Sequence, residues 1–176
     1  MSSPLSPRTA DVGVVLPVHN EQALLAAALE SLGVALSELQ SATFTSGACV
    51  VLDSCTDRSE EITLSWRRDG ARKRIVCEVQ VLATNQRNVG AARAMGCAAL
   101  LEGWKHVNPS RIRLATTDAD SCVPRDWLSE QVRAHEEGVD LLVGPRHHCG
   151  AVVGTRGDRR AVAARLLGRG LADSRH

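Results

Sequence analysis

The feature that most constrains the fold is a set of five short apolar runs, separated by longer segments with helical character. The runs are Val12–Leu16, Ala48–Leu52, Ile75–Leu82, Ile112–Thr117 and Val139–Val143. Several of them are apolar throughout, which is typical of strands covered on both faces. Strands that alternate with helices form a mostly parallel sheet. The pattern therefore predicts an α/β fold with a parallel central sheet.

The segments between the apolar runs carry signals of helix starts. Asn20 follows the first run and is a predicted N-cap, because its side chain can accept a hydrogen bond from a free backbone N–H. Asn88 is a predicted N-cap for a helix over about 89–101, and a further helix is expected over about 124–132. These helices would cover the two faces of the sheet.

The chain of 176 residues fits one domain flanked by two segments of different composition. Residues 1–10 are rich in Ser and Pro and are predicted to be a disordered N-terminus. Residues 11–150 form the predicted α/β domain. Residues 151–176 hold six Arg and two Asp and form a basic Arg/Ala/Gly-rich tail.

Charge and aromatic content argue against a nucleic-acid-binding protein. The formal net charge is only +1, so no overall positive field would attract a phosphate backbone. The chain has three Trp, one Phe and no Tyr, which leaves few rings on which bases could stack. We therefore expect no nucleic-acid partner.

The cysteines and the lengths of the apolar runs indicate the cellular compartment in which the protein is expected. No two of the six cysteines form a CxxC pair, and several lie in apolar runs, so we expect reduced core residues in a cytoplasmic protein. No apolar run reaches the roughly 18 residues of a membrane-spanning helix. The basic tail leaves peripheral contact with the inner face of the membrane as an alternative.

Polar residues follow three of the predicted strands. Pro17, His19 and Glu21 come after the first strand, Asp53 after the second, and residues 118–120 after the fourth. Ligands of parallel α/β sheets bind beyond the carboxyl ends of the strands. The sequence therefore predicts one binding site at that edge.

The strongest local feature is the pair of carboxylates at Asp118 and Asp120, separated by one residue. Hard cations such as Mg²⁺ prefer carboxylate oxygens and keep positions for phosphate oxygens. A diphosphate leaving group requires such charge neutralisation. We predict a metal site for Mg²⁺ or Mn²⁺ here, and the alternative is a solvated acidic turn.

Two further segments could contact a nucleotide. Asp53 can accept hydrogen bonds from a base or a ribose, whereas Asp57 is equally well explained as a residue that shapes the turn and caps the next helix. The small residues of 87–93 allow close backbone approach, and the helix start there favours an anion. Arg87 or Arg93 could pair with phosphate, and the alternative is simple helix–sheet packing.

Four segments in this order resemble family 2 glycosyltransferases. They are VGVVLPVHNEQALLAAALESL, VVLDSCTDRSEEI, NVGAARAMG and TTDADSCVPRDWL. The resemblance runs from about Val12 to Arg146 and implies the GT-A fold, a nucleotide-binding α/β sandwich. It also implies transfer of a sugar from a nucleoside diphosphate sugar to an acceptor hydroxyl, with a divalent metal.

The resemblance assigns roles to individual positions. Pro17 and its neighbours His19 and Glu21 would line the nucleotide pocket, and Asp53 would recognise the base. Arg93 matches the basic residue of the family's AAR segment. Asp118 and Asp120 match the family's DxD motif, which holds the metal and the donor diphosphate, with Asp120 as the more direct ligand.

The end of the chain departs from the family pattern. Asp158 and Asp173 are the only acids after residue 150, and neither matches the family's catalytic base. A donor-binding remnant without transferase activity therefore stays open as an alternative, as does a nucleotidyltransferase of similar fold. The chain has no G-x-G-x-x-G after its first strand and no Walker-type lysine loop, which weakens dehydrogenase and P-loop hypotheses.

Overall fold

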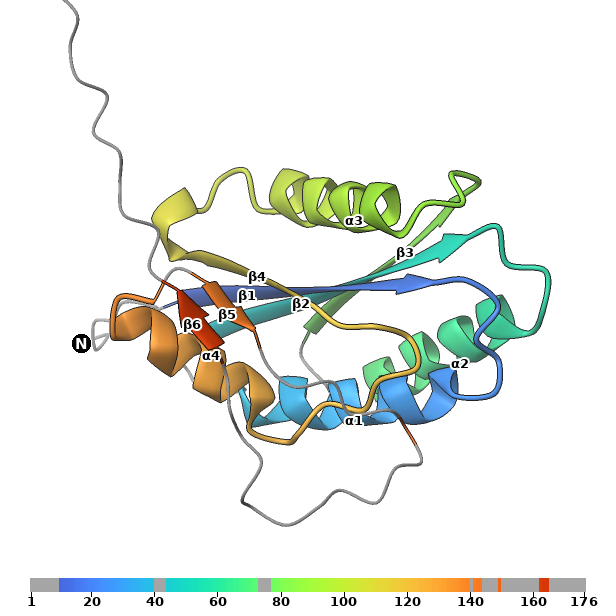
Figure 1. The fold of residues 1–176 in the computed structure, drawn as a ribbon, viewed down its shortest axis with the longest axis horizontal. Coiled ribbons are helices and arrows are strands. Elements are labelled where there is room, and N and C mark those ends of the chain that lie inside the picture. Colours follow the sequence, from blue (N-terminus) through green and yellow to red (C-terminus); the bar gives the residue numbers. More distant parts are fainter. Residues whose placement is uncertain are drawn as a thin grey trace, which may run out of the picture.

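The computed structural model describes residues 10–39, 44–72, 77–139, 141–143, 149 and 162–164. Figure 1 shows the arrangement of the helices and strands. In chain order they are β1 (Ala10–Val18), α1 (Leu25–Glu38), β2 (Phe44–Asp53), α2 (Ser59–Arg72), β3 (Cys77–Thr84), α3 (Val89–Gly103), the 3₁₀ helix η1 (Pro109–Arg111), β4 (Ile112–Thr116), α4 (Trp127–Glu136), β5 (Leu141–Val143) and β6 (Val162–Ala164).

The central sheet has four strands in the order β3-β2-β1-β4. All three strand pairs are parallel, which confirms the predicted parallel sheet. The fifth apolar run supplies β5, which pairs antiparallel with β6 in a separate two-stranded sheet. β6 falls within residues 151–176, the segment predicted as a basic tail.

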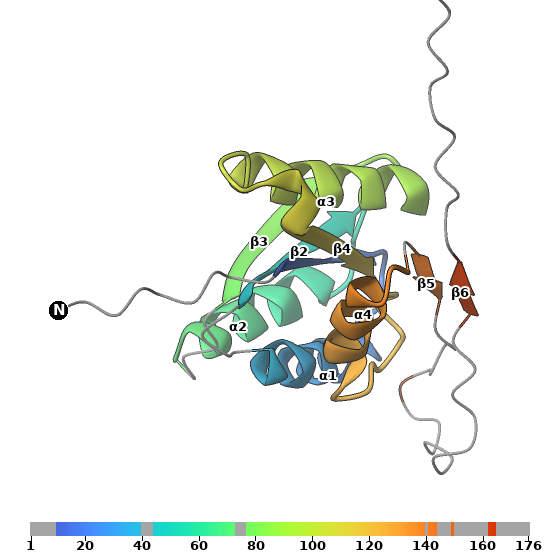
Figure 2. The same ribbon diagram turned by 90° about the vertical axis from the view of Figure 1, so that its left-hand side faces the viewer.

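Helices cover both faces of the central sheet (Figures 1 and 2). α3 lies on one face, where Val15, Cys49 and Leu100 belong to one buried cluster. α1 and α2 lie on the other face, and α4 packs beside α1. The core is built from Leu, Val and Ala, as the scarcity of aromatic residues requires.

Glycines let α3 and the residue after it approach the sheet closely. A Cβ on Gly96 of α3 would lie only 2.5 Å from Val15 Cγ1, so no larger residue fits there without a shift. Trp104, which follows α3, lies against Gly13 and Gly47, where added Cβ atoms would come within 3.2 and 2.9 Å of its ring. The α3 layer is therefore fixed tightly against β1 and β2.

The two predicted N-caps have different outcomes. Asn88 caps α3, because its side chain accepts a hydrogen bond from Ala91 N. The prediction for Asn20 is wrong, since α1 begins only at Leu25. Asn20 instead adopts a positive φ of 52° and accepts a hydrogen bond from Thr56 N at 2.8 Å. A long-range contact has replaced the local one.

The cysteine prediction is also wrong for one pair. Cys122 and Cys149 form a disulfide with a Cα–Cα distance of 4.9 Å. The two residues are 27 positions apart, so a search for closely spaced cysteines could not find them. Cys49, Cys55 and Cys97 are free thiols, as expected.

Across the described part of the chain, every helix is too short or too polar to cross a membrane.

Candidate active site

The loops that follow β1, β2, β3 and β4 meet at one edge of the central sheet, which we call the carboxyl edge. They meet there because the four strands are parallel and in register, with Val18 beside Leu52 and Asp53 beside Thr84. Every site residue predicted from the sequence lies in or next to these loops, or in the first turns of α3.

Backbone N–H groups of the loop after β1 donate hydrogen bonds to side chains of the loop after β2 and of the start of α2. Glu21 N donates to Ser59 Oγ at 3.0 Å, and Gln22 N donates to Asp57 Oδ2 at 2.9 Å. Asp57 Oδ1 also accepts from Ser59 N at 3.0 Å. Burial raises the pKa of the Asp57 carboxyl, but the hydrogen bonds from Ser59 and Gln22 outweigh it and leave the pKa below its ordinary value. These contacts favour the interpretation that Asp57 shapes the turn.

Pro17 ends the pairing between β1 and β4. Val15 O accepts the last bond, from Thr117 N at 3.2 Å. The next N–H on that side of β1 would belong to Pro17, which has none. The ladder therefore stops, and the chain after Thr117 leaves β1 and turns at residues 118–120.

His19 lies in the loop after β1, where it is exposed, and contacts the end of β2. Its Nδ1 is 2.6 Å from the backbone oxygen of Asp53. A carbonyl oxygen can only accept, so Nδ1 carries the proton and Nε2 is the acceptor of the neutral ring. The contact joins the first and second predicted segments of the site.

The carboxylate of Asp53 holds the start of α3. Its Oδ1 accepts from Arg87 N at 2.9 Å and its Oδ2 from Asn88 N at 2.8 Å. Asp53 is only 4% exposed. Burial raises the pKa of this carboxyl, but the hydrogen bonds from Arg87, Asn88, Ser54 and Gln86 more than offset it, so the pKa lies below its ordinary value. The residue is a charged anchor for the loop between β3 and α3.

Arg93, one turn into α3, reaches the acidic turn after β4. Its Nη2 donates to Asp118 Oδ1 in an ion pair, and its Nε donates to Thr116 Oγ1 at 3.1 Å. The side chains of Arg93 and Asp118 are 33% and 26% exposed, so both are accessible to a ligand. The first two turns of α3 thus connect Asp53 at the end of β2 with Asp118 after β4.

The acidic turn itself is anchored by its middle residue. Ala119 is 4% exposed and packs in the core cluster that contains Leu16 and Leu25. Asp118 and Asp120, on either side of it, are only partly buried. Asp120 Oδ1 accepts from Ser121 Oγ at 3.0 Å. The small apolar residue fixes the turn, and this placement keeps the two carboxylates near the surface.

Comparison with known proteins identifies the family. A family model described as "Glycosyl transferase family 2" matches residues 13–173. The chain belongs to glycosyltransferase family 2.

Solved structures agree with this family in fold. TarS from S. aureus (residues 1–349) is 20% identical, with a TM-score of 0.50, over 73% of this chain and 33% of that chain. The mannosyltransferase PcManGT from Pyrobaculum calidifontis, in complex with GDP-Man and Mn²⁺, is 20% identical, with a TM-score of 0.51, over 78% of this chain and 34% of that chain. The fold is thus the GT-A fold. The chain spans about a third of the length of these structures, and no curated protein matches it.

The oxygen atoms of the Asp118–Asp120 pair suit a hard divalent cation. Asp118 and Asp120 offer carboxylate oxygens, which Mg²⁺ and Mn²⁺ prefer. Within the described residues, no group of three or more His, Cys, Asp or Glu side chains could hold a metal. Cations of this kind keep coordination positions for phosphate oxygens and water beside such carboxylates.

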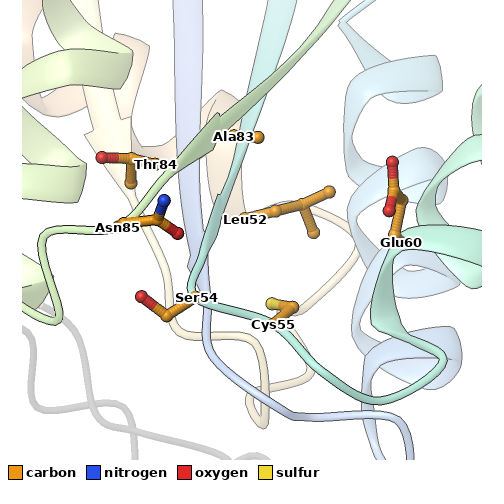
Figure 3. Close-up of a pocket in the computed structure, with 7 residues that line it drawn as sticks. All are labelled: Leu52, Ser54, Cys55, Glu60, Ala83, Thr84 and Asn85. Carbon is orange, nitrogen blue, oxygen red and sulfur yellow. The ribbon is translucent and has the colours of Figure 1, made fainter.

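A small hollow lies beside the site, at the ends of β2 and β3 (Figure 3). Its volume is about 100 Å³, and its lining includes Leu52, Ser54, Cys55 and Glu60. Leu52 belongs to the core on the α1 side of the sheet, whereas Asp53, the next residue, bonds to the start of α3. Thr84, the register partner of Asp53, also lines the hollow, whereas none of the predicted site residues does.

Proposed function

We propose that this chain binds a nucleoside diphosphate sugar at the carboxyl edge, together with Mg²⁺ or Mn²⁺, and transfers the sugar to an acceptor hydroxyl. The observation that carries the proposal is the link made by α3 between two acids. Asp53 holds the backbone before the helix, and Arg93 within the helix pairs with Asp118. A base-recognising group and a phosphate-binding group are thereby supported by one rigid element.

The groups around the start of α3 suit a phosphate compound. The N-terminus of a helix carries free N–H groups and a partial positive charge, both of which favour anions. Arg93 adds a full positive charge at the same end. When bound, a divalent cation would neutralise the charge that develops on the leaving diphosphate.

We assign the nucleoside to the loops after β1 and β2. Pro17 opens the sheet between β1 and β4, and His19 fixes its ring on the backbone of Asp53. Glu21, whose N–H is held by Ser59, completes this side. In this proposal Asp53 both orders the pocket and faces the base. The solved structures of TarS with UDP and of PcManGT with GDP-Man support a nucleoside diphosphate as the class of ligand.

The proposal is tested by thermal unfolding of the full chain with UDP-, GDP- and dTDP-sugars, each with and without Mn²⁺. A ligand that binds only the folded state raises the melting temperature by mass action. We expect one nucleotide class to give a metal-dependent rise. If no sugar nucleotide changes the melting temperature under either condition, the proposal fails.

Two other functions would give different products. A donor-binding remnant would show the metal-dependent rise but no sugar transfer to any acceptor and no slow donor hydrolysis. A nucleotidyltransferase would release pyrophosphate from a nucleoside triphosphate. Assays of released nucleoside diphosphate and of released pyrophosphate separate these alternatives from sugar transfer.

A further inference from the structure

The acidic turn is tied to Cys149 by two bonds. Cys122, two residues after Asp120, forms the disulfide with Cys149. Cys149 N also donates to Asp120 O at 2.8 Å. A covalent bond and a hydrogen bond thus connect Cys149, which is 7% exposed, to a stretch of three residues.

On its other side the turn is held by non-covalent contacts, which include the ion pair of Asp118 with Arg93. Ala119 packs in the core, and Val123 N donates to Ser31 Oγ of α1 at 3.0 Å. Asp120 lies between this inner support and the attachment to Cys149. Its carboxylate is thus on the part of the turn that the disulfide restrains.

We propose that Cys122 and Cys149 are positioning residues for Asp120, so that the disulfide strengthens binding of the divalent cation and its reduction weakens it. The inference rests on the proposed function, because it takes Asp120 as a ligand of the donor's metal. Neither the disulfide nor any role of these cysteines in the site was expected from the sequence.

The physical reason is preorganisation. A ligand group that is already held in its binding geometry loses less conformational entropy when the cation binds. Groups that support metal ligands contribute strongly to metal affinity. Without the disulfide, the bond that the described residues show between Cys149 and the turn is the hydrogen bond from Cys149 N to Asp120 O, and the backbone of Asp120 gains freedom.

The redox step is a thiol–disulfide exchange with a small-molecule dithiol. One thiolate of the dithiol attacks a sulfur of the pair, the S–S bond breaks, and the second thiolate releases the other cysteine. The protein gains two electrons and two protons as two thiols, and the reagent is oxidised to a cyclic disulfide.

The test compares the oxidised full chain with the chain reduced by a dithiol, after anaerobic removal of the reagent because thiols bind Mn²⁺. Binding of Mn²⁺ in the presence of UDP is measured from the electron paramagnetic resonance of free Mn²⁺. We expect about tenfold weaker Mn²⁺ binding after reduction. UDP binding without metal should stay unchanged, a pattern that a purely structural disulfide would not give.

Variants provide the controls. Cys122→Ser/Cys149→Ser should bind Mn²⁺ like the reduced chain and should not respond to the dithiol. Cys97→Ser, which removes a free thiol of α3, should keep both the affinity and the response. Circular dichroism of the reduced wild-type chain checks that it is folded, whether or not the double variant folds.

Three results would overturn the inference. Equal Mn²⁺ affinity of the oxidised and reduced chains, with UDP bound in both, removes the positioning role and leaves the proposed function intact. Loss of the whole fold on reduction assigns the disulfide a general structural role. If the oxidised chain binds neither Mn²⁺ nor any of UDP, GDP and dTDP, the proposed function fails as well.

Discussion

The aspartates at the carboxyl edge make two contrasting kinds of contact. Asp53 is buried, and its carboxylate is occupied by the backbone N–H groups of Arg87 and Asn88. Asp118 and Asp120 stay partly exposed; Asp118 pairs with the side chain of Arg93, and Asp120 accepts a hydrogen bond from the side chain of Ser121. Backbone partners cannot move without moving the fold, whereas side-chain partners can rotate away when a ligand arrives.

The comparison teaches how burial fixes the carboxylate of Asp53 in the fold and leaves those of Asp118 and Asp120 accessible. Burial alone would raise the pKa of Asp53, and the surrounding hydrogen bonds reverse that effect. A carboxylate kept charged in this way stabilises its own loop. The Asp118–Asp120 turn instead buries the alanine between its acids, which leaves both carboxylates near the surface.

The largest expected effect is that of Asp120→Asn on metal binding. The amide keeps the shape of the side chain but removes its charge, so we expect the affinity for Mn²⁺ in the presence of nucleotide to fall about 100-fold. The melting temperature without ligand should stay within about a degree of wild type. Glu30→Gln, on the exposed side of α1, makes the same chemical change away from the site. Equal Mn²⁺ affinities in the two variants would contradict the assignment.

Arg93→Gln should give the next largest effect. It removes the positive charge that pairs with Asp118, and we expect nucleoside diphosphate affinity to fall about tenfold. Arg93→Lys should lie between wild type and the glutamine variant, since a lysine cannot bond to Thr116 and Asp118 in one plane. Isothermal titration with UDP and GDP measures both, and Arg68→Gln on α2 is the matched control. If Arg93→Gln binds UDP and GDP as tightly as wild type does, the proposed contact between Arg93 and phosphate is wrong.

Asp53→Asn should act mainly on stability. One amide oxygen cannot replace both acceptors, so a backbone N–H of Arg87 or Asn88 loses its partner. We expect the melting temperature to fall on the order of 5 °C. Hydrogen exchange should rise at the start of α3 more than at its end. If Asp53→Asn is as stable as wild type but no longer binds nucleotide, Asp53 acts in ligand binding and not in stabilising the start of α3.

The smallest expected effect is a pH dependence of the difference in unfolding free energy between wild type and Asp53→Asn. The pKa of Asp53 in the folded state is below its usual 3.8, so its contribution to stability is present above that pH and is lost as the pH falls through the lowered pKa. The difference in unfolding free energy between wild type and Asp53→Asn should therefore be constant from pH 7 to 5 and shrink below about pH 4. Urea titrations at several pH values measure it, and a difference that stays constant down to pH 3 would contradict the charged anchor.

The features that could be predicted from the sequence are those that depend on local sequence patterns. The parallel sheet follows from apolar runs, and the N-cap of α3 follows from Asn88, whose partner Ala91 is three residues away. β1 (Ala10–Val18) and β2 (Phe44–Asp53) extend beyond the predicted runs at both ends, since polar residues also join a ladder whose neighbours are already paired. β4 instead ends at Thr116, one residue before the end of its predicted run.

What the sequence did not predict depends on contacts between distant segments. Asn20 looked like a cap, but Thr56 on another loop competes for its side chain. The bond of Cys122 to Cys149 is of the same kind, with 27 positions between the residues. The sequence indicated Arg93 and Asp118 as separate candidates, and only the fold brings them together.

The packing of Trp104 on Gly13 and Gly47 has a practical consequence for spectroscopy. The indole is 5% exposed and lies at the end of the sheet away from the carboxyl edge, so its fluorescence emission should be blue-shifted and insensitive to nucleotide. Trp66 and Trp127 pack on the opposite face. With those two replaced by Phe, Trp104 becomes a single intrinsic fluorophore that reports global unfolding without interference from ligand.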